Sequence, residues 1–180
     1  VYDTFHGGDG IDNYSGFIGN VIIFCGAGRD RLYGRQGNDI IFGGDDNDRI
    51  FGDNDDDILS GDAGNDTIVG GSGDDILMGV TGNDTLTGGS GSDTFVFGNG
   101  DGTDRVKDFR VGTDKIGLVE GELTFADLTI EQRGNRTVLG VTSTGETLAT
   151  LDRVDASRLT ESSFVTVPDV SSLEEALTLL

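Results

Sequence analysis

The sequence predicts an all-β protein whose main part is a right-handed parallel β-solenoid of the β-roll type, followed by a smaller β cap and a short terminal helix. Three observations predict this fold class. A nine-residue repeat runs without a gap over residues 7–96. The eighth position of the repeat is apolar in every copy, so one side chain per repeat can face a core. Glycine becomes rarer after residue 97, where we expect the solenoid to end.

Overall composition excludes several classes of function. The formal net charge of -21 repels nucleic acid and anionic membranes. No run of 18 apolar residues is present that could span a bilayer. A single cysteine, Cys25, excludes a disulfide framework. We therefore expect neither a nucleic-acid partner nor a membrane span.

Ten nonads begin at Gly7, and they share a strict pattern. The first position is glycine in nine copies, the fourth is glycine in eight and the sixth is aspartate in nine. The exceptions are Cys25 at the first position, Asp46 and Asp55 at the fourth, and Val21 at the sixth. Residues 1–6 fit the end of an earlier nonad, with Asp3 at the sixth position. We therefore expect the array to open in mid-repeat and an upstream part to precede it.

Each position has a physical role. Glycine adopts positive φ without a Cβ clash, so a six-residue turn can curl and aim its carbonyls inward. The last three residues form a parallel ladder with the copies above and below, and the eighth side chain points inside. Two nonads make one coil with turns on alternate sides, and five coils stack to roughly 24 Å.

Aspartate at the sixth position would form columns of negative charge, which repel unless a cation lies between them. Carboxylate and carbonyl oxygens suit a hard ion of high coordination number, which favours calcium over zinc or copper. Glutamate is absent from the first 119 residues, which indicates that a short carboxylate at a fixed distance from the backbone is required. Residues 1–96 hold 18 aspartates and 4 arginines, a net charge of -14 that up to about eight divalent ions between the turns would nearly cancel.

The pattern G-G-x-G-x-D-x-U-x resembles the RTX (repeats-in-toxin) nonapeptide, the haemolysin-type calcium-binding repeat. The resemblance implies a β-roll that holds calcium between turns 18 residues apart. It assigns the ligands of one side to Asp12, Asp30, Asp48, Asp66 and Asp84, and those of the other side to Asp39, Asp57, Asp75 and Asp93. It also implies ligands from the turn backbone, at Gly34, Gly37, Gly43, Gly44, Gly52, Gly61, Gly64, Gly70, Gly71, Gly73, Gly79, Gly82, Gly88, Gly89 and Gly91.

Departures from the consensus predict unequal sites. Val21 removes a carboxylate and Cys25 replaces a turn glycine, so the early sites should be weaker. The best sites are expected at two pairs, Asp66 with Asp84 and Asp75 with Asp93.

The segment DTFVFGNGDGTDRVKDFRVGTDKIGL, residues 93–118, resembles the segment that closes RTX rolls in serralysin-type secreted proteases and related exoproteins. Asp104 and Asp108 are candidates for a last calcium site there, with exposed loop charges as the alternative, and Asp3 is a candidate at the opposite end. Residues 125–164 resemble the usual C-terminal continuation in that family. They predict three strands that cap the open end of the roll, at 128–132, 137–141 and 147–151.

These patterns divide the chain into three parts. Residues 1–97 are the calcium-binding roll, residues 98–165 the β capping region, and residues 166–180 a linker with a short amphipathic helix. In the RTX family the signal for type I secretion lies at the extreme C-terminus, so residues 171–180 are a candidate signal. A helix packed on the cap and a dimer contact are the alternatives.

The outward strand positions predict that one face of the roll is more apolar than the other. The seventh and ninth positions of the even-numbered nonads carry large apolar residues, at Ile22, Phe24, Ile40, Phe42, Ile58, Ile76 and Met78. We hypothesise that this face docks the cap, an upstream domain or a second copy. The alternative is that flat solenoid faces simply tolerate β-branched residues.

Catalysis is not expected in this chain. His6 is its only histidine, and neither an H-E-x-x-H zinc site nor a G-x-S-x-G motif is present. The sequence is interpreted as the calcium-binding module of an exported bacterial protein, which folds on Ca²⁺ outside the cell and supports type I secretion and the stability of an upstream catalytic or adhesive domain. The alternatives are an adhesin or surface interaction module that uses the apolar outer face, and the C-terminal fragment of a secreted protease or lipase.

Overall fold

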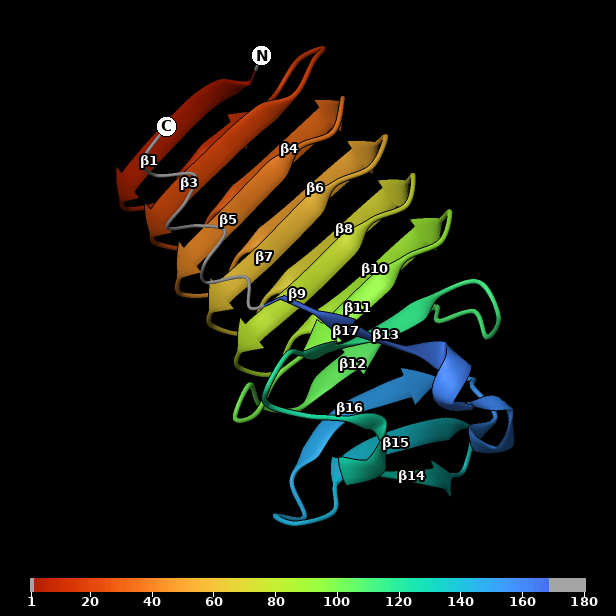
Figure 1. The fold of residues 1–180 in the computed structure, drawn as a ribbon. Helices are drawn as coiled ribbons and strands as arrows, with labels where there is room; N and C mark the ends of the chain where they lie inside the picture. The colour runs from red at the N-terminus through yellow and green to blue at the C-terminus, as the bar shows by residue number, and fades with distance from the viewer. Residues whose placement is uncertain (1, 169–180) are drawn as a thin grey trace.

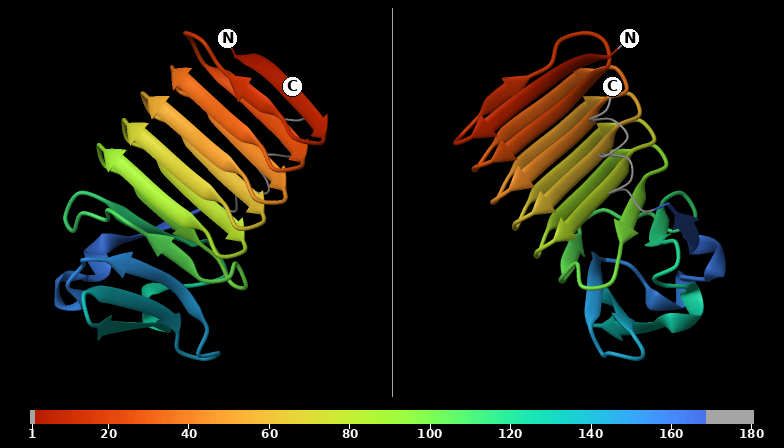
Figure 2. Two further views of the ribbon diagram at one scale, coloured as in Figure 1. Left: turned by 180° about the vertical axis from the view of Figure 1, so that it is seen from behind. Right: turned by 60° about the vertical axis from the view of Figure 1, so that its left-hand side comes forward.

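Two β-sheets, parallel throughout the roll, form the body of the molecule in the computed structural model, which describes residues 2–168 (Figure 1). The order of strands in sheet A is β1–β3–β5–β7–β9–β11–β13–β17, and the order in sheet B is β14–β15–β16–β12–β10–β8–β6–β4–β2. As far as β13 the chain thus alternates between the two sheets and adds one strand to a sheet at each crossing. The colours of Figures 1 and 2 follow this climb, with β1 at the end of the stack farthest from β14. This is the parallel β-solenoid of the β-roll type that the nonads predict.

The strands have the following bounds. Sheet A contains β1 (Asp3–Asp9), β3 (Val21–Ala27), β5 (Ile40–Asp45), β7 (Ile58–Ala63), β9 (Ile76–Thr81), β11 (Thr94–Phe97), β13 (Lys115–Val119) and β17 (Phe164–Val167). Sheet B contains β2 (Asn13–Ser15), β4 (Arg31–Gln36), β6 (Arg49–Asn54), β8 (Thr67–Ser72), β10 (Thr85–Ser90), β12 (Asp104–Val106), β14 (Leu128–Arg133), β15 (Arg136–Val141) and β16 (Thr147–Asp152). Within residues 2–168, three short 3-10 helices follow the roll, η1 (Phe125–Asp127), η2 (Ala156–Arg158) and η3 (Glu161–Ser163).

The core lies between the two sheets and is built from the eighth position. Leu86 of β10 pairs with Ile68 of β8, its equivalent 18 residues earlier, and both are fully buried. The same holds along the stack for Ile23, Leu32, Ile41, Ile50, Leu59, Leu77 and Phe95. Burying a side chain of this size contributes about 1.5–3 kcal/mol, so this column is the main apolar stabilisation of the roll.

The strands of the roll are longer than the sequence pattern predicts. β8 covers the last three positions of one nonad and the first three of the next. Pairing with β10 is interrupted only at the first position, since Thr87 pairs with Val69 and Gly89 with Gly71. The expectation of a six-residue turn was therefore wrong. Stacked turns keep their early backbone groups in register, so the ladder extends into them and only positions four to six lie outside the strands.

The cap continues both sheets beyond residue 97. β12 and β13 pair in parallel with β10 and β11. β16 then joins β12 in parallel, while β15 and β14 add as antiparallel strands at the edge. The three strands expected in the cap are confirmed to within one residue at each end. Asp152 of β16 links the cap to the roll, because its carboxylate pairs with Arg105 of β12 at 2.6 Å and with Arg136 of β15 at 2.9 Å.

The outer faces of the two sheets differ in burial. On sheet A the outward apolar residues form two clusters separate from the core, one of Ile22, Ile40 and Phe42 with Phe24 and Ile58, and one of Met78, Val96 and Val119 with Ile76. On sheet B, Tyr33 and Phe51 are half-buried, and Arg31 and Arg49 are exposed. Docking by the face of sheet A stays a prediction.

The terminal helix and the candidate secretion signal, at 171–180, lie outside the described residues. Within residues 2–168, no helix is long and apolar enough to cross a membrane.

Candidate calcium-binding columns

The sixth-position aspartates form two buried columns, one along each edge of the roll. From Asp30 to Asp93 these residues are at most 3% exposed. In each column, Oδ1 accepts a hydrogen bond from the backbone N–H of the residue 18 positions earlier. The N···Oδ1 distance is 2.7 Å from Asp48 to Asp66 and 2.9 Å from Asp57 to Asp75. One carboxylate oxygen of each aspartate is therefore committed to holding neighbouring turns in register.

The second carboxylate oxygen has no such partner. The Oδ2 atoms are buried without a hydrogen bond in Asp30, Asp39, Asp48, Asp57, Asp66, Asp75 and Asp84. Burying a carboxylate oxygen unpaired is costly, and a native fold tolerates it where a cation compensates. A repeated unpaired oxygen of this kind fits a row of metal ions and does not fit a merely solvated acidic surface.

The glycine at the first position makes room for this oxygen. A Cβ built on Gly52 would overlap Oδ2 of Asp57, and one built on Gly70 would overlap Oδ2 of Asp75. Neither glycine has positive φ, so conformational freedom is not the reason for glycine here. The sequence argument from positive φ holds instead at the second and fourth positions, as at Gly71 (φ 125°) and Gly73 (φ 140°).

Backbone carbonyls of the turns point along the stack. A Cβ built on Gly73 would overlap the carbonyl oxygen of Asp55, and one built on Gly91 would overlap that of Gly73. The second position behaves alike, since a Cβ on Gly89 would overlap the carbonyl oxygen of Gly71. The donor set between turns therefore consists of carbonyl and carboxylate oxygens, which is the set that calcium prefers.

Several non-glycine residues carry positive φ in the turns. Asp46 and Asp55 do so at the fourth position, where the sequence shows the departure from glycine. The second position is also left-handed, and there Arg35, Asp53, Asp62 and Val80 have φ between 68° and 87°. Sequence reasoning missed this requirement because glycine is absent from the second position in half of the nonads.

Five aspartates of the columns ionise less readily in the metal-free chain than a free aspartate does. Burial raises the pKa of Asp57 and Asp66 to about 8, a change that the backbone hydrogen bond opposes and neighbouring aspartates reinforce. The same causes raise the pKa of Asp39, Asp48 and Asp75 to about 6. At neutral pH a bound cation would favour the charged form of these groups.

Both columns continue into the segment that follows the repeats. Oδ1 of Asp104 accepts from the N–H of Asp84 at 2.9 Å, and Oδ1 of Asp114 accepts from that of Asp93 at 3.2 Å. Asp104 was a sequence candidate, and Asp114 was missed because its spacing from Asp93 is 21 residues. The signal that identifies both is the retained G-x-D-x-U core of the nonad, in GTDRV and GTDKI.

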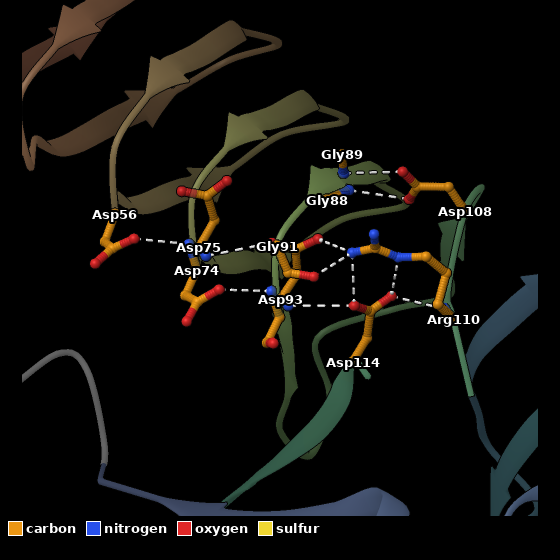
Figure 3. Close-up of polar contacts among 11 residues, drawn as sticks. Asp56, Asp74, Asp75, Gly88, Gly89, Gly91, Asp93, Asp108, Arg110 and Asp114 are labelled. Carbon is orange, nitrogen blue, oxygen red and sulfur yellow. Dashed lines mark hydrogen bonds and ion pairs between the residues drawn. The ribbon is translucent and has the colours of Figure 1, made fainter. Parts of the chain in front are cut away.

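Asp108 lies outside the columns, in the bend that follows β12. Its two carboxylate oxygens accept from the N–H groups of Gly88 at 3.0 Å and Gly89 at 2.9 Å (Figure 3). The residue is partly buried and holds the turn backbone, so it is not a free loop charge.

The first coil is less complete than the others. Asp12 is only half-buried, and Asp3 is exposed at the start of β1. Val21 donates its N–H to Oδ1 of Asp39 at 2.8 Å but offers no carboxylate itself. Ligand atoms of Asp12, Cys25 and Asp30 lie within 4.8 Å of one another. The thiol of Cys25 therefore fills the space that a first-position glycine leaves open in the other nonads.

A second, exposed ladder runs along the fifth position. Asn65 donates its N–H to Oδ1 of Asn47 at 2.7 Å. Asp74 likewise donates its N–H to Oδ1 of Asp56 at 2.8 Å (Figure 3). Sequence reasoning missed this ladder, although the fifth position is Asn or Asp in six consecutive nonads. It ties successive turns together outside the candidate metal columns.

The fold and these columns define a class of protein, a parallel β-solenoid whose stacked turns bind metal ions through oxygen. The family model of the RTX calcium-binding nonapeptide repeat (4 copies) matches residues 6–41, 33–68 and 69–104, more than half of the chain. The chain therefore belongs to the family of RTX calcium-binding nonapeptide repeats, whose ligand is Ca²⁺. The roll is a structural calcium-binding fold.

Several solved structures are similar to the chain. The extracellular lipase LipA from Serratia marcescens is 18% identical with a TM-score of 0.47, over 91% of this chain and 40% of the lipase. Two subunits of the Azotobacter vinelandii mannuronan C5-epimerase also match. AlgE6R3 is 23% identical (TM-score 0.40, 87% of this chain, 78% of that one), and AlgE6R2 is 20% identical (TM-score 0.41, 94% and 95%). The chain spans less than half the length of the lipase. No curated protein matches the chain.

Proposed function

We propose that this chain is the calcium-driven folding module of an exported bacterial protein. The observation that carries the proposal is the row of seven buried Oδ2 atoms without a hydrogen-bond partner. In the metal-free state these oxygens disfavour the folded roll, because each is desolvated beside like charges. Folding of the module is therefore coupled to ion binding.

Two groups of residues would hold the ions. The carboxylates are those of the two columns, from Asp12 to Asp104 and from Asp39 to Asp93, and the carbonyls are those of the second and fourth turn positions. Bound calcium would supply the positive charge that balances the Oδ2 atoms. Up to about eight ions fit the repeat count, since each ion lies between turns two nonads apart. The chain's own contribution is the backbone ladder that fixes the spacing of these oxygens.

Folding that depends on calcium is compatible with export of the chain in its unfolded state. RTX repeats are typical of secreted bacterial proteins. A chain with net charge -21 and 31 glycines stays unfolded where calcium is scarce and can pass a type I secretion channel in that state. Outside the cell, calcium at roughly 10⁻⁴–10⁻³ M folds it. The folded roll then stabilises the upstream catalytic or adhesive domain, while residues 171–180 serve the secretion machinery as the signal.

A calcium titration followed by circular dichroism tests the central claim. The chelated chain should show little β-sheet signal and gain most of it at roughly 10⁻⁴–10⁻³ M calcium. Magnesium at the same concentration is the matched control, because it demands a smaller octahedral site and should not induce the fold. A spectrum that a chelator leaves unchanged contradicts the proposal.

Export is tested separately. Deletion of residues 171–180 should abolish secretion through a co-expressed type I transporter while leaving the calcium-dependent spectrum of the purified chain unchanged. Secretion that survives the deletion contradicts the assignment of the signal.

The apolar outer face of sheet A favours one alternative function, a surface interaction module in which calcium is purely structural. Among the described residues, its clusters around Phe42 and Met78 are apolar groups separate from the main core. Under this alternative, Ile40→Lys should weaken binding of the exported protein to its partner at least tenfold, whereas Thr85→Lys on sheet B should not. If the chain is instead the end of a secreted protease or lipase, the hydrolase motif lies in the upstream sequence.

A further inference from the structure

Arg110 lies at the C-terminal end of the column that runs through Asp93. Its Nη2 donates to the carbonyl oxygen of Gly91 at 2.6 Å, to Oδ2 of Asp93 at 3.1 Å and to Oδ1 of Asp114 at 2.9 Å (Figure 3). Its Nε lies 3.3 Å from Oδ2 of Asp114. Asp93 and Asp114 are almost completely buried, while the arginine side chain is 40% exposed.

The oxygens that Arg110 meets are of the same kinds as those between the preceding turns. Gly91 is a fourth-position carbonyl, Asp93 contributes the sixth-position Oδ2, and Asp114 is the aspartate of the following turn. One coil earlier, the Oδ2 atom of Asp75 is buried without a partner. At Asp93 the guanidinium takes the place of that missing partner.

The other column ends differently and serves as an internal comparison. Asp104 is the last aspartate there, and Oδ2 of Asp84 remains buried without a hydrogen bond. The nearest basic side chain in sequence, Arg105, pairs with Asp152 of the cap instead. The two edges of the roll therefore end in chemically different ways.

We propose that the guanidinium of Arg110 occupies the last interturn position of the column that contains Asp93. It supplies there the positive charge that calcium supplies between the preceding turns. The proposal rests on the calcium-binding function proposed above and specifies where that function stops. A guanidinium is always charged and is tied to the chain, so a chelator cannot remove it. The end of the roll next to the cap then stays ordered at low calcium, and the ion-dependent coils fold onto it.

A matched pair of variants tests this by counting ions. Native mass spectrometry of the calcium-saturated chain gives the number of bound ions per molecule. Asp104→Asn should lose one ion relative to the wild type, because that position holds calcium. Asp114→Asn should lose none, because its position holds Arg110. Equal losses from the two variants would overturn the proposal.

Removal of the arginine is the complementary test. Arg110→Gln should bind one ion more than the wild type, while Arg110→Lys and the surface variant Arg133→Gln should bind the wild-type number.

Hydrogen exchange of the chelated wild type adds a measurement that does not require Arg110→Gln to fold. Residual protection is expected around Asp93 and Asp114. No extra ion in folded Arg110→Gln, or no residual protection in the wild type, counts against the proposal. If the wild type binds no calcium at all, the proposed function itself fails.

Discussion

The C-terminal coils of the roll and its first coil are built from the same nonad, yet they differ in how completely they enclose the sixth-position carboxylates. Around Asp66 and Asp84 the carboxylates are at most 2% exposed. In the first coil Asp12 is half-buried, valine stands at the sixth position and cysteine at the first. A sixth-position aspartate is therefore fully enclosed only through its neighbours, which are one coil on either side and a glycine five residues before it.

The largest expected effect is therefore a difference between two aspartates. Asp66→Asn removes a charge shared by the interturn positions above and below it, and should lower the free energy of unfolding in calcium by about 3 kcal/mol. Asp12→Asn at the open end should lower it by less than about 1 kcal/mol. Urea unfolding at fixed calcium measures both values. Equal losses would show that position along the roll does not matter.

A pair of substitutions at the first position should have the next largest effect. Gly70→Ala places a Cβ against Oδ2 of Asp75, so the calcium concentration needed for folding should rise at least threefold, a cost of about 0.7 kcal/mol per ion. Cys25→Gly restores the missing space in the first coil and should lower that concentration. Calcium titrations followed by circular dichroism compare the two variants. A shift in the same direction for both would contradict the role assigned to glycine.

How far the sequence predicts this molecule differs between its two parts. Within the nonads the fixed period places both the core position and the sixth-position carboxylates, so columns such as Asp57 with Asp75 follow from spacing alone. Past residue 97 insertions stretch the period, and the partner of Asp93 at Asp114 is hidden by a spacing of 21 residues. The contact of Arg110 depends on how this longer loop folds back, which no periodicity encodes.

Acid should act in opposite directions on the metal-free and the calcium-loaded roll. In the metal-free fold the pKa values of Asp57 and Asp66 are raised to about 8 from the ordinary value of 3.8. The folded state then binds more protons than the unfolded one, so this stabilisation is complete below pH 3.8 and is lost as the pH rises through about 8. With calcium present, protons compete for the same oxygens, so acid weakens the fold.

Circular dichroism of metal-free and calcium-saturated chain at about pH 5 and about pH 7.5 distinguishes the two cases. The metal-free chain should gain β-sheet signal at the lower pH, whereas the calcium-loaded chain should need more calcium there. A metal-free spectrum that is the same at both pH values contradicts the assignment of the buried carboxylates.

The smallest expected effect concerns backbone strain at the fourth position. Asp46 is exposed and has a φ of 78°, where most other nonads have glycine. Asp46→Gly removes the left-handed strain and one charge that raises the pKa of Asp48, so the calcium-loaded roll should gain about 0.5–1 kcal/mol. The matched control is Asn47→Gly, at a neighbouring position whose φ is not positive. This substitution removes the Oδ1 atom that accepts the N–H of Asn65, so it should destabilise the roll. Urea unfolding in calcium measures both. A gain from Asn47→Gly as large as that from Asp46→Gly would show that the fifth-position ladder does not hold the coils together.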